Sequence, residues 1–577
     1  MIRSVKYSFA LSRLAKNFST KSIPRQPSYY HKTGKDPLVY RTIGQQLDLS
    51  AQRYPNNEAV VFCDEDKRLN FSDLKSQVDR LAAGFIRLGL EPGDCLAIWA
   101  PNYLFWYLSM LATTKAGLIS VGLNPAFQGP EIKYALNKVN VKAIVMPESF
   151  KSQHYYEILK TIIPDLDNFE PGNINCSSIP SLKTIIVDSK DSYKSAFKFN
   201  DVCDIATAEN TQKLKKIESN IDPDSPANIQ FTSGTTGLPK ATLLSHYSMI
   251  NNGIHMASRF HLYGGERLCG LLPLFHVFGL IVSKLSALSA GATLIVPSPG
   301  FDAESTLKAI NNEKCTTIHG APTMYISLVE AQKKLNLPIN TLKYAGTGGA
   351  ACSPQFIEDI GQVLNTPKVL NGFGISELSG ATFFQDLDGS REDMLETVGH
   401  LNDHLEAKVV DRDGKVVPFG TPGELLVRGY STMMGYFGDQ EKTDEVMGPG
   451  GWYRTGDQFI LREDGYGIVV GRLKEMIIRG GENIFPKEIE DLLITHPDII
   501  ECYVVGVPDK RMGEEACVFL RIAEGKEMDA EKIKEFCKGK IAHFKIPKYC
   551  RVVSDFPKTL SGKVQKFKLT EIFEKGL

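Results

Sequence analysis

Apolar runs and amphipathic segments alternate along most of the chain. Runs of four or five mostly apolar residues predict strands that are buried on both faces, at 95–99, 142–146, 184–187 and 292–296. Apolar positions spaced three and four residues apart predict helices over 43–54 and 71–90. Buried strands that alternate with amphipathic helices are typical of parallel sheets, so the sequence predicts an α/β fold.

Two longer apolar stretches, 103–123 and 269–296, could be taken for membrane spans. Lys115 interrupts the first stretch, and Lys284 with several other polar residues interrupts the second. A membrane-spanning helix needs about 20 predominantly apolar residues, so both stretches are predicted to be buried core segments. In contrast, 149–226 is polar and weakly periodic. We expect it to run mostly over the surface.

The pattern changes near residue 472, where a second, smaller unit is predicted to begin. Its expected elements are a helix, two strands and a charged helix, at 486–495, 502–507, 516–522 and 529–538. A basic tail follows. The 577 residues of the chain are enough for two to four domains.

Composition and charge narrow the class of protein. The chain is 42% hydrophobic and 23% charged, which is ordinary for a soluble globular protein. A formal net charge of −1 gives no electrostatic reason to expect a nucleic-acid partner. The eleven cysteines form no C-x-x-C pair, which indicates reduced thiols and no metal site built from cysteine.

The first 35 residues differ in kind from the rest. They contain eight Arg and Lys residues and no Asp or Glu, and their apolar residues fall roughly on one helical side. This composition is typical of a mitochondrial transit peptide, which we predict for 1–35. The alternative is a basic disordered tail without a targeting role.

One loop is suited to polyphosphate. Gly234 and Gly237 allow the backbone to approach an anion closely, and hydroxyl groups with the Lys240 ammonium can donate to phosphate oxygens. The alternative is a surface turn rich in Ser, Thr and Gly. The candidate phosphate-binding residues are Thr232, Ser233, Gly234, Thr235, Thr236, Gly237, Leu238, Pro239 and Lys240.

Further motifs follow this loop in a fixed order. They are Leu-Pro-Leu-Phe-His at 272–276, Gly-Phe-Gly-Ile-Ser-Glu at 372–377, Gly-Glu-Leu-Leu-Val-Arg-Gly at 423–429, Trp-Tyr-Arg-Thr-Gly-Asp at 452–457, Gly-Arg-Leu-Lys-Glu at 471–475, Gly-Gly-Glu-Asn-Ile-Phe-Pro at 480–486 and Pro-Lys-Thr-Leu-Ser-Gly-Lys at 557–563. With these motifs the chain resembles the adenylate-forming AMP-binding superfamily from about residue 40 to its end. The resemblance implies a large N-terminal domain of α/β subdomains (36–471) and a small mobile α+β lid (472–577).

The resemblance also implies a reaction in two halves. A carboxylate attacks the α-phosphorus of ATP and gives an acyl-adenylate and diphosphate; the thiol of CoA then attacks the acyl carbon and releases AMP. ATP, CoA and Mg²⁺ are the expected co-substrates and metal, and Glu377 is the implied metal ligand. Neither half needs a protein nucleophile, so catalysis should consist of positioning and charge neutralisation.

Residue roles are carried over from the resemblance at matching positions. Asp457 and Arg472 are expected at the ribose. Phe373 stands where the family usually has tyrosine and keeps the ring that can stack on adenine. Ser376 stands where the family has threonine and keeps the hydroxyl. The remaining expected AMP-binding residues are Gly348, Gly349, Ala350, Gly372, Gly374 and Ile375.

Three further roles concern catalysis and the lid. Lys563 is expected to bridge the carboxylate and the α-phosphate, and His276 to lie beside the substrate carboxylate. From the residues alone, a solvated lysine and an ordinary core histidine remain alternatives. Lys474 is the expected hinge, and rotation there would bring Gly480 and Gly481 to the thioester half-reaction.

Within the superfamily the chain is similar to mitochondrial medium-chain acyl-CoA ligases, which implies a place in the mitochondrial matrix. The expected acyl pocket is apolar or small and contains no cation for a second carboxylate; its residues are Val277, Phe278, Met324 and Gly346. An aryl acid, or a carrier-protein thiol as acceptor, is the alternative. A scaffold without activity is disfavoured because the charged motif residues are all retained.

Overall fold

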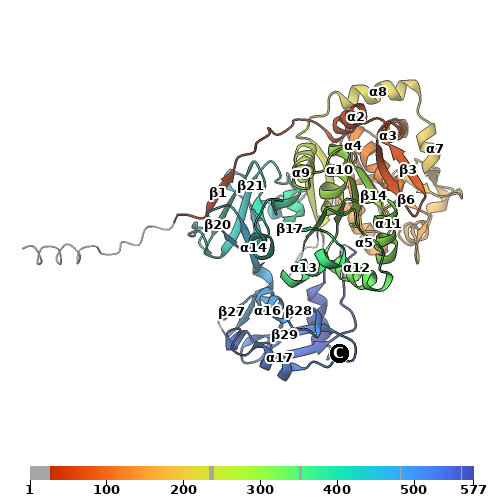
Figure 1. Cartoon of the computed structure of the whole chain (residues 1–577). Helices are drawn as coiled ribbons and strands as arrows, with labels where there is room; N and C mark the ends of the chain where they lie inside the picture. The colour runs from red at the N-terminus through yellow and green to blue at the C-terminus, as the bar shows by residue number, and fades with distance from the viewer. Residues whose placement is uncertain (1–25, 233–238, 350–353, 481, 561, 577) are drawn as a thin grey trace, which may run out of the picture.

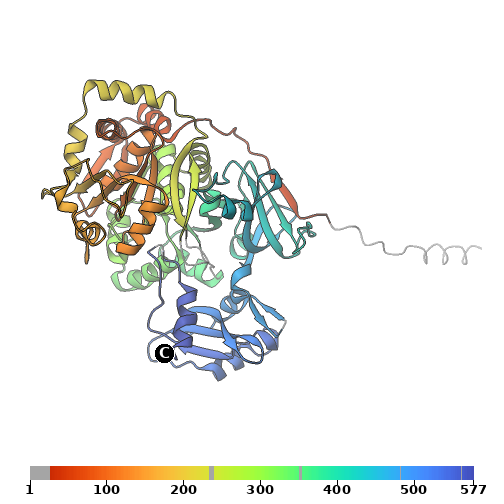
Figure 2. The same cartoon turned by 180° about the vertical axis from the view of Figure 1, so that it is seen from behind.

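The computed structural model describes residues 26–232, 239–349, 354–480, 482–560 and 562–576. A large body and a small unit are joined through a narrow connection (Figures 1 and 2). Residues 1–25 of the predicted transit peptide (1–35) and residues 233–238, which hold most of the predicted phosphate loop, lie outside the described residues, as do Ala350 and Gly481. The predicted end of the transit peptide at residue 35 is too late, because Tyr29–Lys32 form a strand, β1, that pairs with the body's β20 (Leu405–Val410).

The large body contains two mostly parallel sheets. The eight-stranded sheet runs in the order β10 (Ala196–Lys198), β9 (Thr184–Asp188), β6 (Val141–Pro147), β4 (Cys95–Trp99), β5 (Ile119–Leu123), β11 (Pro226–Thr232), β12 (Lys240–Ser245) and β22 (Gly435–Tyr436). Its first six strands are parallel, and β12 and β22 are antiparallel to their neighbours.

The nine-stranded sheet provides the second parallel layer. Its order is β19 (His400–Leu401), β18 (Gly380–Phe384), β17 (Lys368–Ile375), β16 (Tyr344–Gly348), β15 (Thr317–His319), β13 (Arg267–Gly270), β14 (Thr293–Val296), β2 (Glu58–Phe62) and β3 (Lys67–Asn70). The strands from β17 to β2 are parallel, so their carboxyl ends meet at one edge of the sheet.

Helices form three layers around these sheets. Those between the sheets are α2 (Ile43–Arg53), α3 (Phe71–Arg87), α4 (Leu104–Lys115), α9 (His246–Arg259) and α10 (Ser286–Ala290). The outer faces are covered by α5 (Gly129–Lys138) and α6 (Tyr155–Ile162) on one sheet, and by α11 (Ala303–Asn312), α12 (Pro322–Leu335) and α13 (Pro354–Val363) on the other. The body is therefore a five-layered α/β structure.

Strand β4 shows why buried strands are apolar at every position. Leu96 and Ile98 point into the core between the two sheets, whereas Ala97 and Trp99 point into the core under α5 and α6. Alternate side chains on a strand face opposite sides of the sheet, so a strand with a core on each side needs no polar face. All four strands predicted from apolar runs are confirmed.

Both long apolar stretches belong to the core, as predicted. Helix α4 is buried around its whole circumference, which a helix between two sheets requires. The second stretch contains β13, the π-helix η2 (Phe278–Leu285), α10 and β14. Among the described residues, no helix is both long enough and apolar enough to cross a membrane.

Most residues of 149–226 are at least partly exposed, as predicted, but the segment also contributes strands, helices and buried side chains to the body. Besides β9 and β10, the segment contains the hairpin β7 (Ser149–Phe150) and β8 (Gln153–His154), α6, α7 (Phe199–Asp204) and α8 (Ala208–Glu218). Tyr155, Leu159 and Ile174 are completely buried against the eight-stranded sheet. These apolar residues are spaced irregularly by turns, and therefore they lack the periodicity by which a core segment is recognised.

An antiparallel sheet completes the large body. Its order is β1 (Tyr29–Lys32), β20 (Leu405–Val410), β21 (Gly423–Gly429), β24 (Trp452–Leu461) and β23 (Met447–Gly448), with β25 (Gly467–Arg472) also paired to β24. Every second residue along most of β24 is buried. The hairpin of β24 and β25 lies at the boundary of the body, because the chain passes from β25 directly into the small unit.

The small unit has cores of its own on both faces of a five-stranded sheet. Its strands are β26 (Ile477–Arg479), β27 (Glu482–Ile484), β28 (Ile499–Asp509), β29 (Gly513–Ile522) and β30 (Tyr549–Val552), and its helices are α16 (Pro486–Leu493), α17 (Ala530–Cys537) and α18 (Lys566–Glu574). The four elements predicted for this unit are confirmed within a few residues. Figure 1 shows the sheet below the body.

A buried ion cluster ties three helices of the central layer together. The side chain of Lys115 is 2% exposed, and its Nζ lies 2.5 Å from Asp48 Oδ1, 2.7 Å from Asp79 Oδ1 and 3.5 Å from Glu218 Oε1. Burial raises the pKa of Glu218 to about 7, while Lys115 opposes that rise. Removal of this ammonium would leave Lys75, which pairs with Asp48 and Asp79 at the edge of the cluster, as the one remaining described cation for three carboxylates.

Replacement of this lysine should destabilise the large body. We expect Lys115→Met to lower its free energy of unfolding by about 3–5 kcal/mol, because uncompensated charge would remain in the core. Thermal unfolding followed by calorimetry measures the effect. Lys308→Met is the matched control, since Lys308 pairs with Glu304 on an exposed helix face and should matter little. Equal melting temperatures for the two variants would contradict the account.

Candidate active site

The predicted phosphate loop connects two antiparallel strands. Thr232 ends β11 and lies opposite Lys240, which begins β12, so the sheet register fixes both ends of the loop. Lys240 Nζ donates to the hydroxyl oxygen of Tyr436 at 3.3 Å, and the Tyr436 hydroxyl donates to Glu377 Oε1 at 3.0 Å. The chain of contacts brings the loop cation and the predicted metal ligand to one place.

Glu377 lies just beyond the carboxyl end of a parallel strand. β17 ends at Ile375, and the short 3₁₀ helix η3 (Ser376–Leu378) follows it. The backbone of Met433 donates to the Glu377 carbonyl at 2.8 Å, which fixes the turn. Partial burial lowers the pKa of Lys240, and the nearby Glu377 opposes this shift. The Tyr436 hydroxyl lies between the two side chains and is hydrogen-bonded to both.

Glycines keep the strands of the predicted adenine site close together. Gly348 on β16 pairs with Gly372 on β17, and a Cβ atom on Gly348 would lie 2.7 Å from the carbonyl oxygen of Gly372. Gly349 has a φ of +83°, which favours glycine. The ring of Phe373 is half-buried and lies 5.7 Å from Phe459 between centroids.

A carboxylate with one unpaired oxygen lies beside these strands. Asp457 on β24 is opposite Arg472 on β25, and Arg472 Nε lies 3.0 Å from Asp457 Oδ1. Asp457 is 3% exposed, and its Oδ2 has no hydrogen-bond partner among the described residues. Burial raises the pKa of Asp457, although Arg472 and Lys563 counteract the rise. The unpaired Oδ2 can therefore accept a hydrogen bond from a hydroxyl group.

Lys563 of the small unit lies near the Asp457–Arg472 pair of the body. Its loop is closed by the Thr559 N–H, which donates to the Lys563 carbonyl at 2.8 Å, and Gly562 has a φ of +81°. Thr323 of the large body donates from its hydroxyl to the Gly562 carbonyl at 3.0 Å. The loop is thus docked on α12. The Lys563 side chain stays accessible to solvent, and desolvation within the cleft, followed by Arg472, lowers its pKa.

His276 lies close enough to Lys563 for the lysine's positive charge to affect the pKa of the imidazole. Burial lowers the pKa of His276 to about 4, and the Lys563 ammonium contributes to that shift. The Phe278 N–H donates to His276 Nδ1 at 3.2 Å, so the neutral ring carries its proton on Nε2. The imidazole can therefore donate a hydrogen bond from Nε2 at neutral pH.

The residues of the predicted acyl pocket do not all line one cavity. Met324 lines a cavity of about 510 Å³ between the body and the small unit, together with Thr323 and Gly562. Phe278 and Gly346 instead lie around a buried histidine of β15, as described below. Val277 is buried in the core between the two sheets.

Two family profiles match most of the chain, although Asp457 and Arg472 lie between the two matched ranges. A profile described as "AMP-binding enzyme" matches residues 47–437, and one described as "AMP-binding enzyme C-terminal domain" matches residues 488–563. The first match alone spans more than half of the chain. The chain belongs to the AMP-binding enzyme family.

Similar proteins agree with this assignment over at least 90% of their length. "Medium-chain acyl-CoA ligase ACSF2, mitochondrial" from Danio rerio is 41% identical over 553 residues, which cover 95% of this chain and 91% of that protein. The protein of the same name from Homo sapiens is 42% identical over 559 residues, with 95% and 90% covered.

Solved structures confirm the predicted fold class. ATP-bound MatB from Rhodopseudomonas palustris has a TM-score of 0.78 at 25% identity, over 92% of this chain and 99% of that one. The anthranilate CoA ligase AuaEII in complex with anthranoyl-AMP has a TM-score of 0.81 at 23% identity, over 94% and 99%, which is a likeness of fold.

The predicted hinge lies where this AMP-binding enzyme passes from body to small unit. Arg472 ends β25, and Lys474 lies in the single turn η5 (Leu473–Glu475) before β26. Gly480 has a φ of +59°, and its N–H donates to the Met512 carbonyl at 2.8 Å. In this conformation the small unit places Lys563 near Asp457, whereas Gly480 contacts Met512 of the small unit itself.

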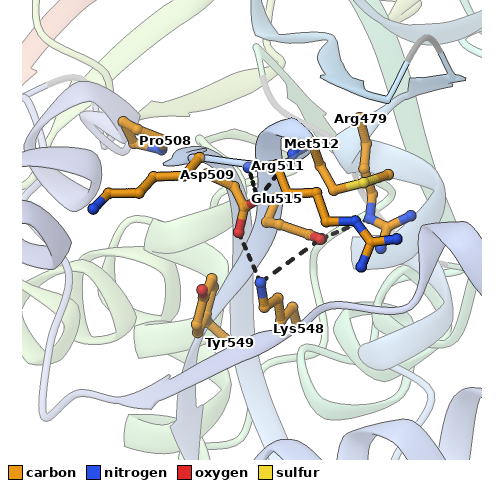
Figure 3. A pocket seen from close by; sticks show the side chains of 9 residues that line it. Arg479, Pro508, Asp509, Arg511, Met512, Glu515, Lys548 and Tyr549 are labelled. Carbon is orange, nitrogen blue, oxygen red and sulfur yellow. Dashed lines mark hydrogen bonds and ion pairs between the residues drawn. The ribbon is translucent and has the colours of Figure 1, made fainter.

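A second cavity, of about 710 Å³, lies beside Gly480 and is lined only by residues of the small unit. Figure 3 shows Lys548 between Asp509 and Glu515, with Arg479 on the other side of Glu515. Lys548 Nζ lies 2.7 Å from Asp509 Oδ2, and Arg479 Nε lies 2.6 Å from Glu515 Oε2. Lys510 and Arg511 add two more cations to its wall.

Sequence reasoning missed two residues of the site. Tyr436 links Lys240 to Glu377, and Thr323 holds the Lys563 loop. Both contacts join segments far apart in the chain, so spacing could not predict them. The Gly-Tyr-Phe-Gly turn at 435–438 was the one signal, because glycines on both sides of an aromatic residue indicate close packing.

Proposed function

We propose that this protein is an ATP-dependent medium-chain fatty acyl-CoA ligase of the mitochondrial matrix. It converts a fatty acid, ATP and CoA into acyl-CoA, AMP and diphosphate through an acyl-adenylate. The observation that carries the proposal is the meeting of Lys563 from the small unit with His276 and the Asp457–Arg472 pair of the body. The relatives named as medium-chain ligases support the choice of acid and of compartment.

The nucleotide is placed by the unpaired carboxylate oxygen. Asp457 Oδ2 accepts from a ribose hydroxyl, and Arg472 donates alongside it. The adenine then lies against the glycine-lined edge of β16 and β17, with Phe373 as the stacking ring. The triphosphate extends toward Thr232 and Lys240 at the ends of the phosphate loop.

The residues present fit a magnesium ion on the phosphates. Tyr436 donates to Oε1 of Glu377, and among the described residues no hydrogen bond reaches the second oxygen. Mg²⁺ favours one or two carboxylates together with phosphate oxygens, so Glu377 would hold it with the hydroxyl of Thr232 nearby. When bound, the ion neutralises charge on the phosphates.

Adenylation needs a carboxylate and a phosphate to approach each other despite their like charges. The Lys563 ammonium lies in the cleft between them and reduces this repulsion. His276, neutral at pH 7, donates from Nε2 to the carboxylate and orients it. A new O–P bond forms at the α-phosphorus, and the bond to the β-phosphate oxygen breaks with release of diphosphate.

Thioester formation uses another face of the small unit. Rotation at Lys474 withdraws Lys563 and brings Gly480 toward the acyl carbon, where the absence of a side chain leaves room for the pantetheine arm. The cations around the 710 Å³ cavity then suit the phosphates of CoA. The S–C bond forms as the C–O bond to AMP breaks.

One assay tests the proposed function directly. Purified protein with ATP, Mg²⁺, CoA and single acids from acetate to palmitate should release AMP and acyl-CoA in equal amounts. The highest kcat/KM is expected for acids of about octanoate length. AMP without acyl-CoA would indicate another acceptor, and a preference for benzoates would assign the protein to aryl acids; either result overturns the proposal.

Loss of the ribose carboxylate should weaken use of ATP. In Asp457→Ala we expect the KM for ATP to rise about ten-fold or more, because a charge-assisted hydrogen bond is worth about 1.5–3 kcal/mol. Steady-state kinetics with varied ATP measures this. Asp464→Ala is the matched control, since Asp464 lies in the exposed turn of the same hairpin. An ATP dependence unchanged in Asp457→Ala would mean that the pair with Arg472 is only structural.

Mutations on the two faces of the small unit should impair different half-reactions. Lys563→Ala should slow acyl-adenylate formation by roughly 10²-fold or more, as does loss of one preorganised donor elsewhere. The same variant, given synthetic acyl-adenylate and CoA, should form thioester at nearly the normal rate. Lys474→Pro fixes φ at the hinge and should give the reverse pattern.

Rapid-quench measurements of diphosphate and acyl-CoA distinguish these outcomes. Lys568→Ala is the control for charge, because Lys568 is exposed on α18 only five residues from Lys563. If both variants impair both half-reactions equally, a single fixed arrangement of the small unit replaces the alternating one.

A further inference from the structure

His319 is a buried polar group for which the reaction so far has no use. It ends β15, is 0% exposed, and its Nε2 has no hydrogen-bond partner among the described residues. Burial lowers its pKa to about 3, so the imidazole is neutral. A buried acceptor or donor without a partner is costly and uncommon in native structures, which calls for an explanation at this position.

The surroundings of His319 place it in the predicted acyl pocket. Its ring lies 6.3 Å from that of Phe278 and 4.1 Å from that of Phe260, between centroids. A Cβ atom on Gly346 would lie 2.5 Å from Phe260 Cζ and 3.0 Å from His319 Cδ2, so the absence of a side chain at Gly346 leaves room for both rings. Two of the four predicted acyl-pocket residues therefore contact this histidine.

The sheet links this pocket to the reacting groups. His319 pairs with Gly270 at the end of β13, and the chain continues from β13 to His276. On its other side His319 pairs with Gly346, two residues before Gly348 of the predicted adenine site. The imidazole thus lies at the carboxyl edge of the sheet, between the strands that lead to the substrate carboxylate and to the nucleotide.

Ser283 determines which atom of the ring carries the proton. The Ser283 hydroxyl donates to the Phe278 carbonyl at 3.4 Å, one turn back in the π-helix η2, and its oxygen lies 3.1 Å from His319 Nδ1. Because the Ser283 hydroxyl proton is directed at the Phe278 carbonyl, its oxygen accepts a hydrogen bond from the Nδ1–H of His319. A neutral imidazole has one donor and one acceptor, so Nε2 presents a lone pair.

We propose that the floor of the acyl pocket accepts a hydroxyl group, so that the acid activated by this enzyme carries a hydroxyl toward the far end of its chain. The hydroxyl donates to His319 Nε2, beside the half-buried Phe278 ring. The proposal rests on the proposed function. Pockets that hydrogen-bond a substrate hydroxyl disfavour the analogue without it, because the protein group is then left unpaired.

Competing substrates test this proposal with the full-length enzyme. Octanoate is compared with octanoates that bear a hydroxyl on the last or last-but-one carbon, and with the matching keto acid. We expect one hydroxy acid to exceed octanoate in kcat/KM by about ten-fold, the value of roughly one buried hydrogen bond. The keto acid has no donor and should gain nothing.

Variants assign the preference to the histidine. His319→Phe keeps a ring but no acceptor, so the ratio of kcat/KM values for hydroxy acid and octanoate should fall to about one. Ser283→Ala frees the tautomer and should reduce the ratio and raise use of the keto acid. His246→Phe is the matched control, because His246 also has a buried, unpaired Nε2 but lies on α9 and accepts from Ile43.

Each outcome bears on one claim. If the wild-type enzyme shows no preference for a hydroxy acid, or prefers the keto acid, the proposal is wrong. This test uses no variant, so its result does not depend on whether a variant folds. A preference that persists in His319→Phe, or is lost equally in His246→Phe, also overturns it. If no acid at all yields acyl-CoA, the proposed function fails instead.

Discussion

The ion pair between Asp457 and Arg472 fixes the end of the last strand of the body, at the boundary with the small unit. Arg472 is the last residue of β25, and its contact with a carboxylate that is 3% exposed holds this strand end against β24. In the rotation that we propose, movement would therefore begin after Arg472, at the predicted hinge Lys474. The pair also leaves one buried oxygen unpaired, which is costly in the absence of a ligand and favours binding of a diol.

The other groups are arranged around this pair by the two sheets. Parallel strands collect their carboxyl ends at one edge, and ligands bind there in open α/β sheets. β13 leads to His276, β16 to Gly348 and β17 to Glu377, while the antiparallel β11 and β12 present the phosphate loop. The small unit contributes Lys563 through one docked loop, held by Thr323. A body that is rigid apart from one hinge can thus serve two chemical steps in turn.

How far the sequence predicted this molecule depended on the range of each interaction. Strands at 95–99 and 292–296 and the helix at 71–90 were found because burial on both faces, or on one side, is visible as periodicity. The family and its fold were found because the charged motifs have side chains that the chemistry requires. Tyr436, Thr323 and the cluster around Lys115 join distant segments, and no local pattern predicts such contacts. The buried aromatic residues of 149–226 were missed because turns break their spacing.

The expected roles of Lys563, His276, Asp457 and Glu377 remain predictions, although the structure brings these residues together. The Gly480 side of the small unit lies at a separate cavity in the same conformation. The central claim is therefore that one conformation adenylates and that the small unit must move before CoA reacts.

A reversible crosslink between the two units tests this claim most directly. Arg521 Nη1 of β29 lies 3.2 Å from Glu330 Oε1 of α12, so Glu330→Cys with Arg521→Cys allows a cleavable thiol-reactive linker to hold the present arrangement. The account predicts that the linked enzyme releases diphosphate and accumulates acyl-adenylate, and forms acyl-CoA only after the linker is cleaved. Acyl-CoA formed by the linked enzyme at the rate of the unlinked one would contradict it.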